Sequence, residues 1–391
     1  MKPSILNRRR DDEKGESFLE GLKCISALDL VKDWKTWRAT LKEGIQAACK
    51  MAFLTKPSYN LAKRVFTVFW GLFLFWSNPS EVCAQGAMAR LFSPQIGLLK
   101  TTFSFEGAPY QKEDITSQTG KELQMTRYNA SLLVPIAQDP KEEWGMIGSF
   151  RGQDIKTEAI LPDTKKDFPD SVWDVRLGPL YRKRFENGWI GGAVLTVGSA
   201  SDRLFANIDV MELQATFFLR IPDGERNAWL ALLAYSNNRE FLNNVPLPGV
   251  GYWYEPSERY RILIGIPFAF LEARPSRDVS MEFSYLPLRS VRAKISYRFW
   301  GPLQIYGTFD WRNESYFLTE RSDERNRFFY YEKRLISGVR WNLSRQASLD
   351  LSLGYAFDRL YFEARNYEDR NRNRVDVEDG PFASLQLGLR F

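Results

Sequence analysis

The chain has 391 residues, of which 44% are hydrophobic and 15% aromatic, and this composition excludes a bundle of several apolar membrane helices. Its net charge is +6, but residues 1–84 hold 14 Lys and Arg against 9 Asp and Glu, which leaves 40 against 39 for residues 85–391. The main part of the chain is therefore nearly neutral, and no nucleic-acid partner is expected.

The first 50 residues form an N-terminal extension to which we assign no function. They combine a charged stretch at 8–14 with apolar residues at helical spacing between Leu22 and Leu41. Met51 opens a segment with an ordinary basic lead-in to an export signal, so translation is expected to start there. Residues 1–50 are interpreted as a wrongly assigned start or as a disordered or helical segment.

Residues 51–84 have the pattern of a signal peptide. A basic pair precedes the apolar run 65–76, a polar stretch follows, and small or branched residues at 82–84 favour cleavage between Ala84 and Gln85. The apolar run is shorter than the roughly 20 residues of a transmembrane helix. A buried helix of a cytosolic domain is the alternative, and lipidation of Cys83 is disfavoured because Glu81 lies close before it.

The residue types that are missing after position 84 narrow the possible chemistry. All three cysteines precede residue 85, and the chain has no His, which excludes His-dependent triads, bases and metal sites. Glu282 with Asp310 could do acid–base work, but lumen acids near arginines are more often structural. The loop 369–380 lacks the glycine and the bidentate glutamate of a calcium loop. The sequence therefore predicts no catalytic residue, no metal site and no cofactor.

Alternating side chains are the main structural signal in residues 85–391. Between 348 and 358 the odd positions are apolar and the even positions are Ser, Asp, Gly or Ala, a period of two that is typical of a strand with lipid on one side and water on the other. We predict an all-β fold, a transmembrane antiparallel up-and-down β-barrel of about 14 strands, or 12 because 259–287 alternates poorly. The predicted strands are 95–106, 124–136, 144–155, 172–185, 188–199, 207–221, 228–237, 259–266, 278–287, 289–300, 303–316, 328–343, 347–363 and 380–391.

The connections between these strands form two classes. One set is mostly short and is expected in the periplasm: 138–143, 186–188, 222–227, 267–277, 301–302 and 344–346. The other set contains the long polar stretches 107–123, 156–171, 238–258, 317–327 and 364–379, which are expected to be extracellular. The pair Asn187-Gly188 is a strong hairpin signal.

Aromatic residues recur at one end of alternate strands. Trp144, Trp189 and Trp229 begin predicted strands, and Trp300 and Trp341 end them, all on the expected periplasmic side. This placement predicts an aromatic girdle at a membrane interface, to which Phe391 also belongs. A soluble periplasmic β-sandwich also alternates, but it has no reason to place tryptophan repeatedly at one end.

The final strand and one internal motif carry a resemblance. The segment 384–391 alternates and ends in Phe391, which resembles the C-terminal strand that the barrel-assembly machinery reads in outer-membrane proteins. The run 245–257 followed by an apolar strand resembles a motif of an uncharacterised family of bacterial outer-membrane β-barrel proteins, over roughly residues 95–391. The resemblance implies a barrel in the outer membrane of a Gram-negative bacterium, in contact with its lipid, and it implies no activity.

The inner face of the barrel decides the functional alternatives. A folded N-terminal plug is not expected, because only about ten residues separate the cleavage site from the first predicted strand. In one interpretation, the lumen charges line a porin-like pore for small, anionic solutes. In the other, they pair with one another and fill the lumen. The second function class is a non-conducting structural or adhesive barrel that acts through its extracellular loops. The tentative lumen residues are Arg127, Arg176, Arg182, Arg292, Lys294, Arg298, Arg340, Arg390, Asp174, Glu282, Asp310 and Asp350, together with Asp358.

Overall fold

The computed structural model describes residues 91–239, 242–286, 290–321 and 323–391. The predicted extension, signal peptide and cleavage site at Ala84 and Gln85 lie outside these residues. Within them, no helix has the length and apolar character needed to cross a membrane.

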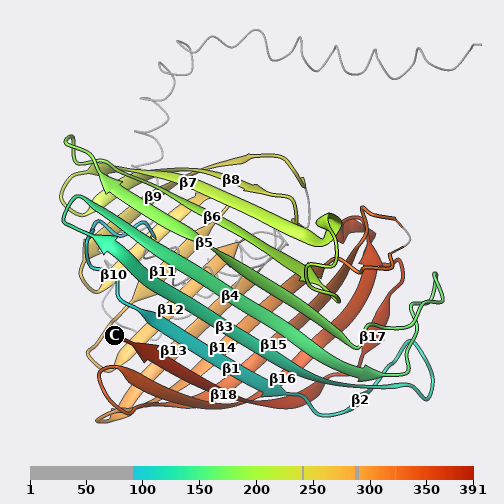
Figure 1. Cartoon of the computed structure of the whole chain (residues 1–391). Helices are drawn as coiled ribbons and strands as arrows, with labels where there is room; N and C mark the ends of the chain where they lie inside the picture. Colours follow the sequence, from blue (N-terminus) through green and yellow to red (C-terminus); the bar gives the residue numbers. More distant parts are fainter. Residues whose placement is uncertain (1–90, 240–241, 287–289, 322) are drawn as a thin grey trace, which may run out of the picture. The chain divides into compact units, whose positions relative to one another are not determined.

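Sixteen antiparallel strands form a closed ring, in which β1 pairs with β3 on one side and with β18 on the other (Figure 1). Closure matters because a strand edge left in lipid would expose unpaired backbone N–H and C=O groups. The short strands β2 (Glu113–Asp114) and β17 (Val375–Val377) lie outside the ring. The ring consists of β1 (Thr102–Pro109), β3 (Glu122–Gln138), β4 (Glu142–Thr157), β5 (Ser171–Arg184), β6 (Ile190–Ser201), β7 (Met211–Asp223), β8 (Asn227–Ser236), β9 (Leu247–Ser257), β10 (Tyr260–Ile266), β11 (Ala269–Ala273), β12 (Val279–Leu286), β13 (Ser290–Trp300), β14 (Leu303–Tyr316), β15 (Arg327–Asn342), β16 (Ala347–Ala364) and β18 (Gly380–Arg390).

The expected all-β barrel is confirmed, but the predicted strand number of 14, or 12, is wrong. The two additional strands are β9, which lies in a predicted loop, and β11, which lies in the predicted turn 267–277. The first was missed because it contains two prolines and two glycines, and the second because five residues are too few for a visible alternation. Consequently β10 runs opposite to the direction predicted for 259–266. The first strand also begins at Thr102 and not at residue 95.

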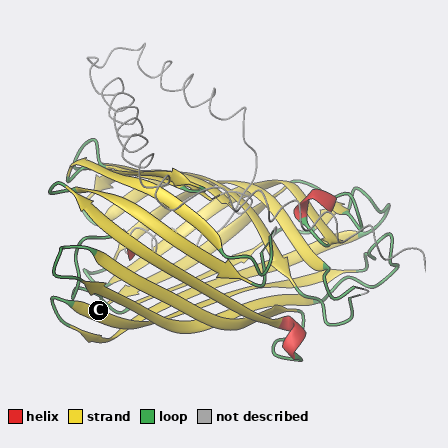
Figure 2. Cartoon of the chain, turned by 90° about the horizontal axis from the view of Figure 1, so that it is seen from above, coloured by secondary structure: helices red, strands yellow, loops and turns green. Residues whose placement is uncertain are grey.

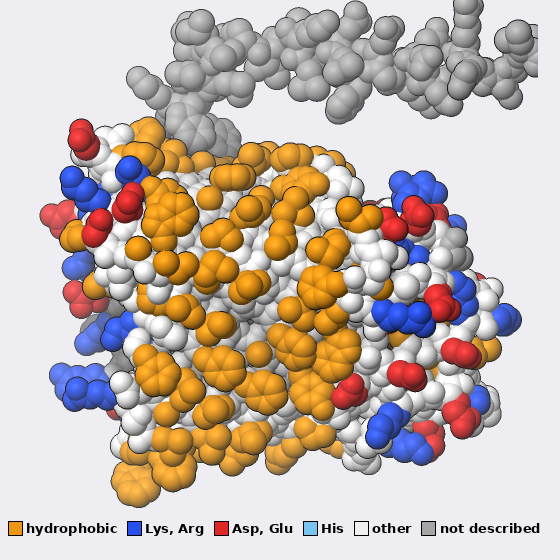
Figure 3. Space-filling view, viewed as in Figure 1, with side chains coloured by type: hydrophobic (Ala, Val, Ile, Leu, Met, Phe, Trp, Pro, Cys, Tyr) orange, Lys and Arg blue, Asp and Glu red, His pale blue; other side chains and the backbone are white. Residues whose placement is uncertain are grey.

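The outer face of the ring is apolar and the inner face is polar. On β16, Leu351 and Leu353 are 58% and 71% exposed, whereas Asp350 and Ser352 between them are buried. In the space-filling view, hydrophobic side chains cover the middle of the wall and charged side chains gather at its two ends (Figure 3). This is the distribution of a protein whose wall is surrounded by lipid, and the chain is an outer-membrane β-barrel.

The two ends of the barrel differ in their connections (Figure 2). At the end that we call the turn end, which also holds the C-terminus, strands are joined by short turns; Asn187 and Gly188 lie in one of these, and Gly188 has a φ of +79°. At the opposite end, the loop end, most connections are longer, such as 158–170 and 365–379. Two loop-end connections are exceptions, because β10–β11 and β12–β13 are joined by only two and three residues.

The wall has a tall sector and a short sector. The tall sector, β14 to β16, has strands of 14 to 18 residues, whereas the short sector, β10 to β12, has strands of seven, five and eight. The tall sector leans across the lumen at the loop end: Phe317, just after β14, donates its backbone N–H to the carbonyl of Ala200 on β6 at 2.7 Å. From the β8–β9 loop, the side-chain nitrogen Nδ2 of Asn238 lies 3.5 Å from the backbone carbonyl oxygen of Ser315.

Candidate functional site: the barrel lumen

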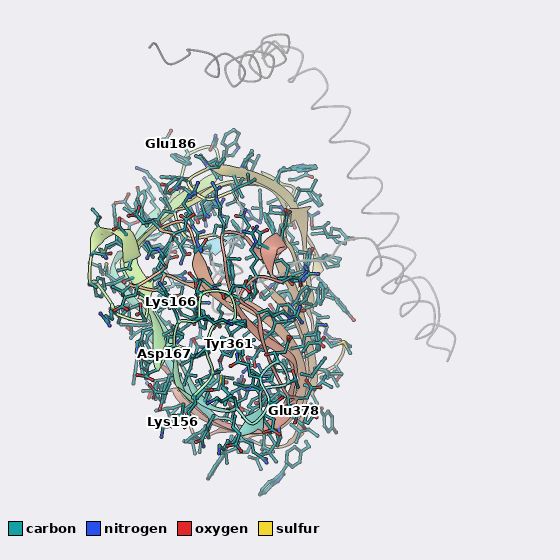
Figure 4. All side chains as sticks on the ribbon, turned by 90° about the vertical axis from the view of Figure 1, so that its right-hand side faces the viewer. Lys156, Lys166, Asp167, Glu186, Tyr361 and Glu378 are labelled. Carbon is teal, nitrogen blue, oxygen red and sulfur yellow. The ribbon has the colours of Figure 1, made fainter. Side chains whose placement is uncertain are left out.

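A hydrophobic core closes the lumen at the loop end. It combines inward-facing strand residues such as Tyr316, Phe328 and Tyr361 with Leu161 and Phe168 from the β4–β5 loop, all of them buried. Viewed along the barrel from this end, Tyr361 lies inside the ring (Figure 4). Among the described residues, the packed rings, for example Phe328 and Tyr361 with centroids 5.4 Å apart, leave no open mouth of the porin kind at this end.

A layer of paired charges lies next to this core. Arg127 on β3 reaches across the lumen to two carboxylates of the tall sector, Glu314 at 2.6 Å and Glu332. Arg334 on β15 pairs with Asp310, which also accepts from Arg312 at 2.7 Å. All these side chains are at least nine-tenths buried, and buried charges persist only where partners compensate the loss of hydration. This layer therefore fills the lumen, as one of the two sequence-based interpretations expects.

The second half of the charged layer lies on β4, β5 and β7. Asp174 accepts from Arg151 and from Arg176, whose Nε lies 2.8 Å from it and 2.9 Å from Glu212. Tyr361 connects this half to the hydrophobic core by donating to Gln153 at 2.9 Å. The layer thus spans the lumen from one wall to the other.

Beyond the charged layer, toward the turn end, the lumen holds a cavity of about 790 Å³. Its walls are mainly apolar, with Leu133, Ile147 and Leu180 on one side and Leu232 and Phe268 on another. Among the described lining residues there is no Asp or Glu, but there are seven arginines: Arg151, Arg176, Arg182, Arg239, Arg340, Arg345 and Arg390.

The carboxylates that accompany four of these arginines stand outside the cavity lining. Arg151 and Arg176 share Asp174, Arg182 pairs with Glu143 at 2.8 Å, and Arg340 pairs with Asp350 at 2.9 Å. These four arginines line the cavity, whereas their carboxylate partners do not. The cavity surface is therefore apolar with cationic points, a combination suited to an anion that also carries apolar surface.

A short segment before the first strand occupies the turn end of the lumen. Phe92 is buried there, with its ring 5.4 Å from Phe218 and 6.4 Å from Phe268. Arg182 donates to the carbonyls of Leu91, at 3.1 Å, and Gln95. Sequence reasoning missed this segment because seven residues without alternation give no signal of where they pack.

Gly97 lets this segment pass close to the β3–β4 turn. Its φ is +78°, and a Cβ at this position would lie 2.5 Å from the carbonyl oxygen of Asp139. Gly97 also donates its N–H to Glu143 at 2.7 Å. In the same turn, backbone hydrogen bonds from Glu142 and Lys141 lower the pKa of Asp139. The glycine, the turn and Glu143 together hold the segment at the wall.

The strand register places the twelve tentative lumen residues in positions of the inward face. Glu282 lies opposite Lys294, and Arg292 lies opposite Asp310. Lys294 also stacks over the ring of Tyr306 at 4.0 Å. The register brings the following residues onto the same face: Arg127, Arg176, Arg182, Arg298, Arg340, Arg390, Asp174 and Asp350.

Asp358 is a correction to this set. The pairing of β15 with β16 shifts between Tyr331 and Lys333, and Asp358 has a φ of +50° at the resulting irregularity. Its side chain is 56% exposed and pairs with Lys333, so it does not lie among the lumen charges. The alternation of the sequence could not reveal this, because one extra residue reverses the direction of every side chain that follows it.

The predicted girdle tryptophans all lie at the turn end, close to strand termini. Trp144, Trp189, Trp300 and Trp341 are between 38% and 72% exposed, and Phe391 is 62% exposed. Trp229 differs, because it is only 3% exposed and packs against Tyr252 with ring centroids 4.8 Å apart.

The described residues contain no cluster of three or more His, Cys, Asp or Glu able to hold a metal ion. Of the two carboxylates considered for acid–base work, Asp310 is held by Arg312 and Arg334. Its position is that of a structural counter-ion, because two arginines already bind it.

No family model matches the chain, and no curated protein matches it. Among solved structures, the matches include bacterial outer-membrane channels. An outer-membrane channel from Pseudomonas putida F1 is 10% identical over 76% of this chain and 98% of its own, with a TM-score of 0.33. The toluene transporter TodX of Pseudomonas putida is 10% identical over 81% of this chain and 95% of its own, with a TM-score of 0.36. OccK7 of Pseudomonas aeruginosa is 8% identical over 75% and 99%, with a TM-score of 0.33.

Proposed function

We propose that the protein is an outer-membrane channel for small anionic solutes. This proposal rests on the cavity of about 790 Å³. Seven arginines line this cavity, and its described lining residues include no Asp or Glu. A cationic lining attracts anions and repels cations in a confined space of low dielectric constant. A barrel that served only as a scaffold would have no use for a hollow of one charge sign.

In this proposal the turn end faces the periplasm and the loop end faces the outside, as is usual for barrels with short turns on one side. The cavity then lies toward the periplasm, because residues of turn-end connections, Ser344 and Arg345, line it. The hydrophobic core and the charged layer lie toward the outside. Solute would therefore be held on the periplasmic side of a closed barrier.

The closed loop end favours one competing function, a non-conducting barrel that acts through its outer loops. Conductance and solute uptake separate the two. The refolded full-length barrel in liposomes is expected to admit small anions such as benzoate faster than cations of similar size such as benzylammonium. Arg345→Glu with Arg390→Glu, at two cavity arginines, should reduce this preference by about tenfold, in line with the 1–3 kcal/mol of a charge contact.

Arg325→Glu provides the matched control, because Arg325 pairs with Asp323 in an exposed loop at the loop end and neither residue lines the cavity. It should leave the anion preference unchanged. If the unmodified barrel admits neither ion faster than protein-free liposomes, the channel proposal is wrong and the non-conducting barrel stands.

A further inference from the structure

The short sector of the wall does not reach across a bilayer. A strand advances about 3.3 Å per residue, so the seven residues of β10 at a tilt of about 40° rise roughly 17 Å, against an apolar band about 25 Å tall. The β11 strand, with five residues, is shorter still. The turn between them, Pro267–Phe268, therefore lies within the depth of the hydrocarbon layer. Its outer flank is apolar, since Ile264 and Ile266 are 44% and 60% exposed.

Two strands near the short sector, β9 and β14, extend farther toward the loop end than the β10–β11 turn does. Ile266, at the end of β10, lies opposite Val250, so β9 continues toward the loop end through Leu247–Gly249. On the other side, β13 begins at Ser290 opposite Arg312, and β14 extends four residues farther. Among the described residues, no strand occupies the part of the wall between these two edges, above Pro267–Phe268 and Leu286, and this part is called the side window here.

The cavity reaches this side window. Its lining includes Pro267 and Phe268 from the β10–β11 turn, Leu286 at the end of β12, and Leu247–Gly249 on the β9 edge. The same lining includes the arginines of the lumen. The cavity therefore extends from the arginines of the lumen to the low part of the wall at the β10–β11 turn.

We infer that the side window is the route by which solute passes between the cavity and the outer leaflet of the membrane, and that the solute is a small amphiphile with an apolar body and an anionic group. This inference rests on the proposed channel function. Three observations carry it. The loop end is closed by the hydrophobic core and the charged layer, the hollow reaches the wall at membrane depth, and its lining is apolar with cationic points. A purely hydrophilic anion would have to leave water to use this route.

The test follows two fluorescent anions into proteoliposomes that contain serum albumin to trap them. 8-Anilinonaphthalene-1-sulfonate is a permanently charged amphiphile, and naphthalene-1,3,6-trisulfonate is an anion of similar size without a free apolar face. The full-length barrel should accelerate entry of the first by at least about tenfold over protein-free liposomes and give the second less than about twofold, because only the first tolerates the lipid side.

Blocking the side window should remove this uptake. Ala234 lines the cavity opposite Leu247, so Ala234→Trp places a large ring beside the side window and should lower entry of the amphiphile by about fivefold or more. Ala231→Trp on the same strand is the matched control, because Ala231 is exposed on the outer face. It should change the rate by less than about twofold. Heat-modifiable migration on gels confirms that both variants fold.

Each other outcome has a distinct meaning. If both anions enter equally and Ala234→Trp has no effect, the channel proposal stands and the side window is overturned. If neither anion enters, the proposed function itself fails. If Ala234→Trp abolishes folding, Leu247→Trp, on the facing strand and in the same lining, replaces it, and unchanged entry of the amphiphile through that variant would overturn the inference.

Discussion

The tall and the short sectors of the same ring make different contributions to the lumen. The tall sector, β14 to β16, contributes Asp310, Glu314, Glu332 and Arg334 to the charged layer and leans over to contact β6. The short sector contributes the turn that borders the cavity. The tall sector therefore helps to fill the lumen at the loop end, whereas the short sector borders its hollow part.

The largest effect is expected in the tall sector. Arg334→Ala leaves the buried Asp310 with one cation fewer and should destabilise the barrel by about 3–5 kcal/mol, because an uncompensated buried charge is costly. Urea unfolding of the refolded barrel, followed by tryptophan fluorescence, measures this. A loss below about 1 kcal/mol would mean that the charged layer does not hold the tall sector together.

A local effect, with little change in the global stability of the barrel, is expected beside the short sector. Phe92→Ala removes a ring packed between Phe218 and Phe268, and deletion of a buried Phe typically costs about 3–5 kcal/mol. Because residues 91–97 precede the first strand of the ring, this loss should free the segment and leave the urea midpoint of the barrel nearly unchanged. Hydrogen exchange of this segment should rise. Equal loss of protection throughout the barrel would contradict the separation of segment and ring.

The depth of the short sector can be measured directly. Ile266→Arg at the end of β10 should cost about 2–4 kcal/mol if this strand ends near the bilayer midplane, and about 0–1 kcal/mol if it ends at an interface. Leu353→Arg, on the outer face of the tall sector, is the reference. Similar losses for the two variants in phospholipid vesicles would support the contrast between the sectors, and a negligible loss at Ile266 would place the β10–β11 turn at the membrane surface.

The smallest effect belongs to an exposed loop of the tall sector. Hydrogen bonds from Arg325 lower the pKa of Asp323 to about 2. A lowered pKa stabilises the folded state above the unfolded-state pKa of roughly 4, and this contribution is lost as the pH falls through about 2. Asp323→Asn should therefore leave the urea midpoint unchanged at pH 7 within error, since solvent screens an exposed pair. A clear shift at pH 7 would show that this loop takes part in closing the lumen.

The sequence supported the barrel most strongly where lipid and water face opposite sides of one long strand. The alternation of 347–363 and its neighbours predicted β13 to β16 within a few residues. It failed at β9 and β11, where Pro248, Gly249 and Gly251 interrupt the pattern and where five residues suffice for a strand that does not cross the membrane. Periodicity detects a full crossing, and these strands gain their stability from neighbours that the sequence does not reveal.

Alternation along the strands can suggest which residues face the lumen, but it cannot give the shape of the cavity. Alternation suggested Arg176, Arg182, Arg340 and Arg390 as lumen residues, and all four line the cavity. The alternation does not show that Asp and Glu are absent from the described cavity lining, or that Phe92 packs in the turn end of the lumen. Both features depend on packing between residues far apart in the sequence. Asp358 shows the converse, because a local irregularity was enough to reverse an expected direction.

The pairing of β1 with β18 has a consequence for the order of assembly. Thr102 lies opposite Arg390, so the bond that completes the cylinder joins segments almost 290 residues apart. Such a distant contact forms late, because the entropy of closing so long a chain segment must be overcome before the contact contributes any energy. Until then both terminal strands expose unpaired backbone N–H and C=O groups, which promote aggregation in water and cost free energy among lipid tails. Both edges therefore stay unpaired until β1 and β18 meet, which makes this pairing the last step that protects the backbone of the ring.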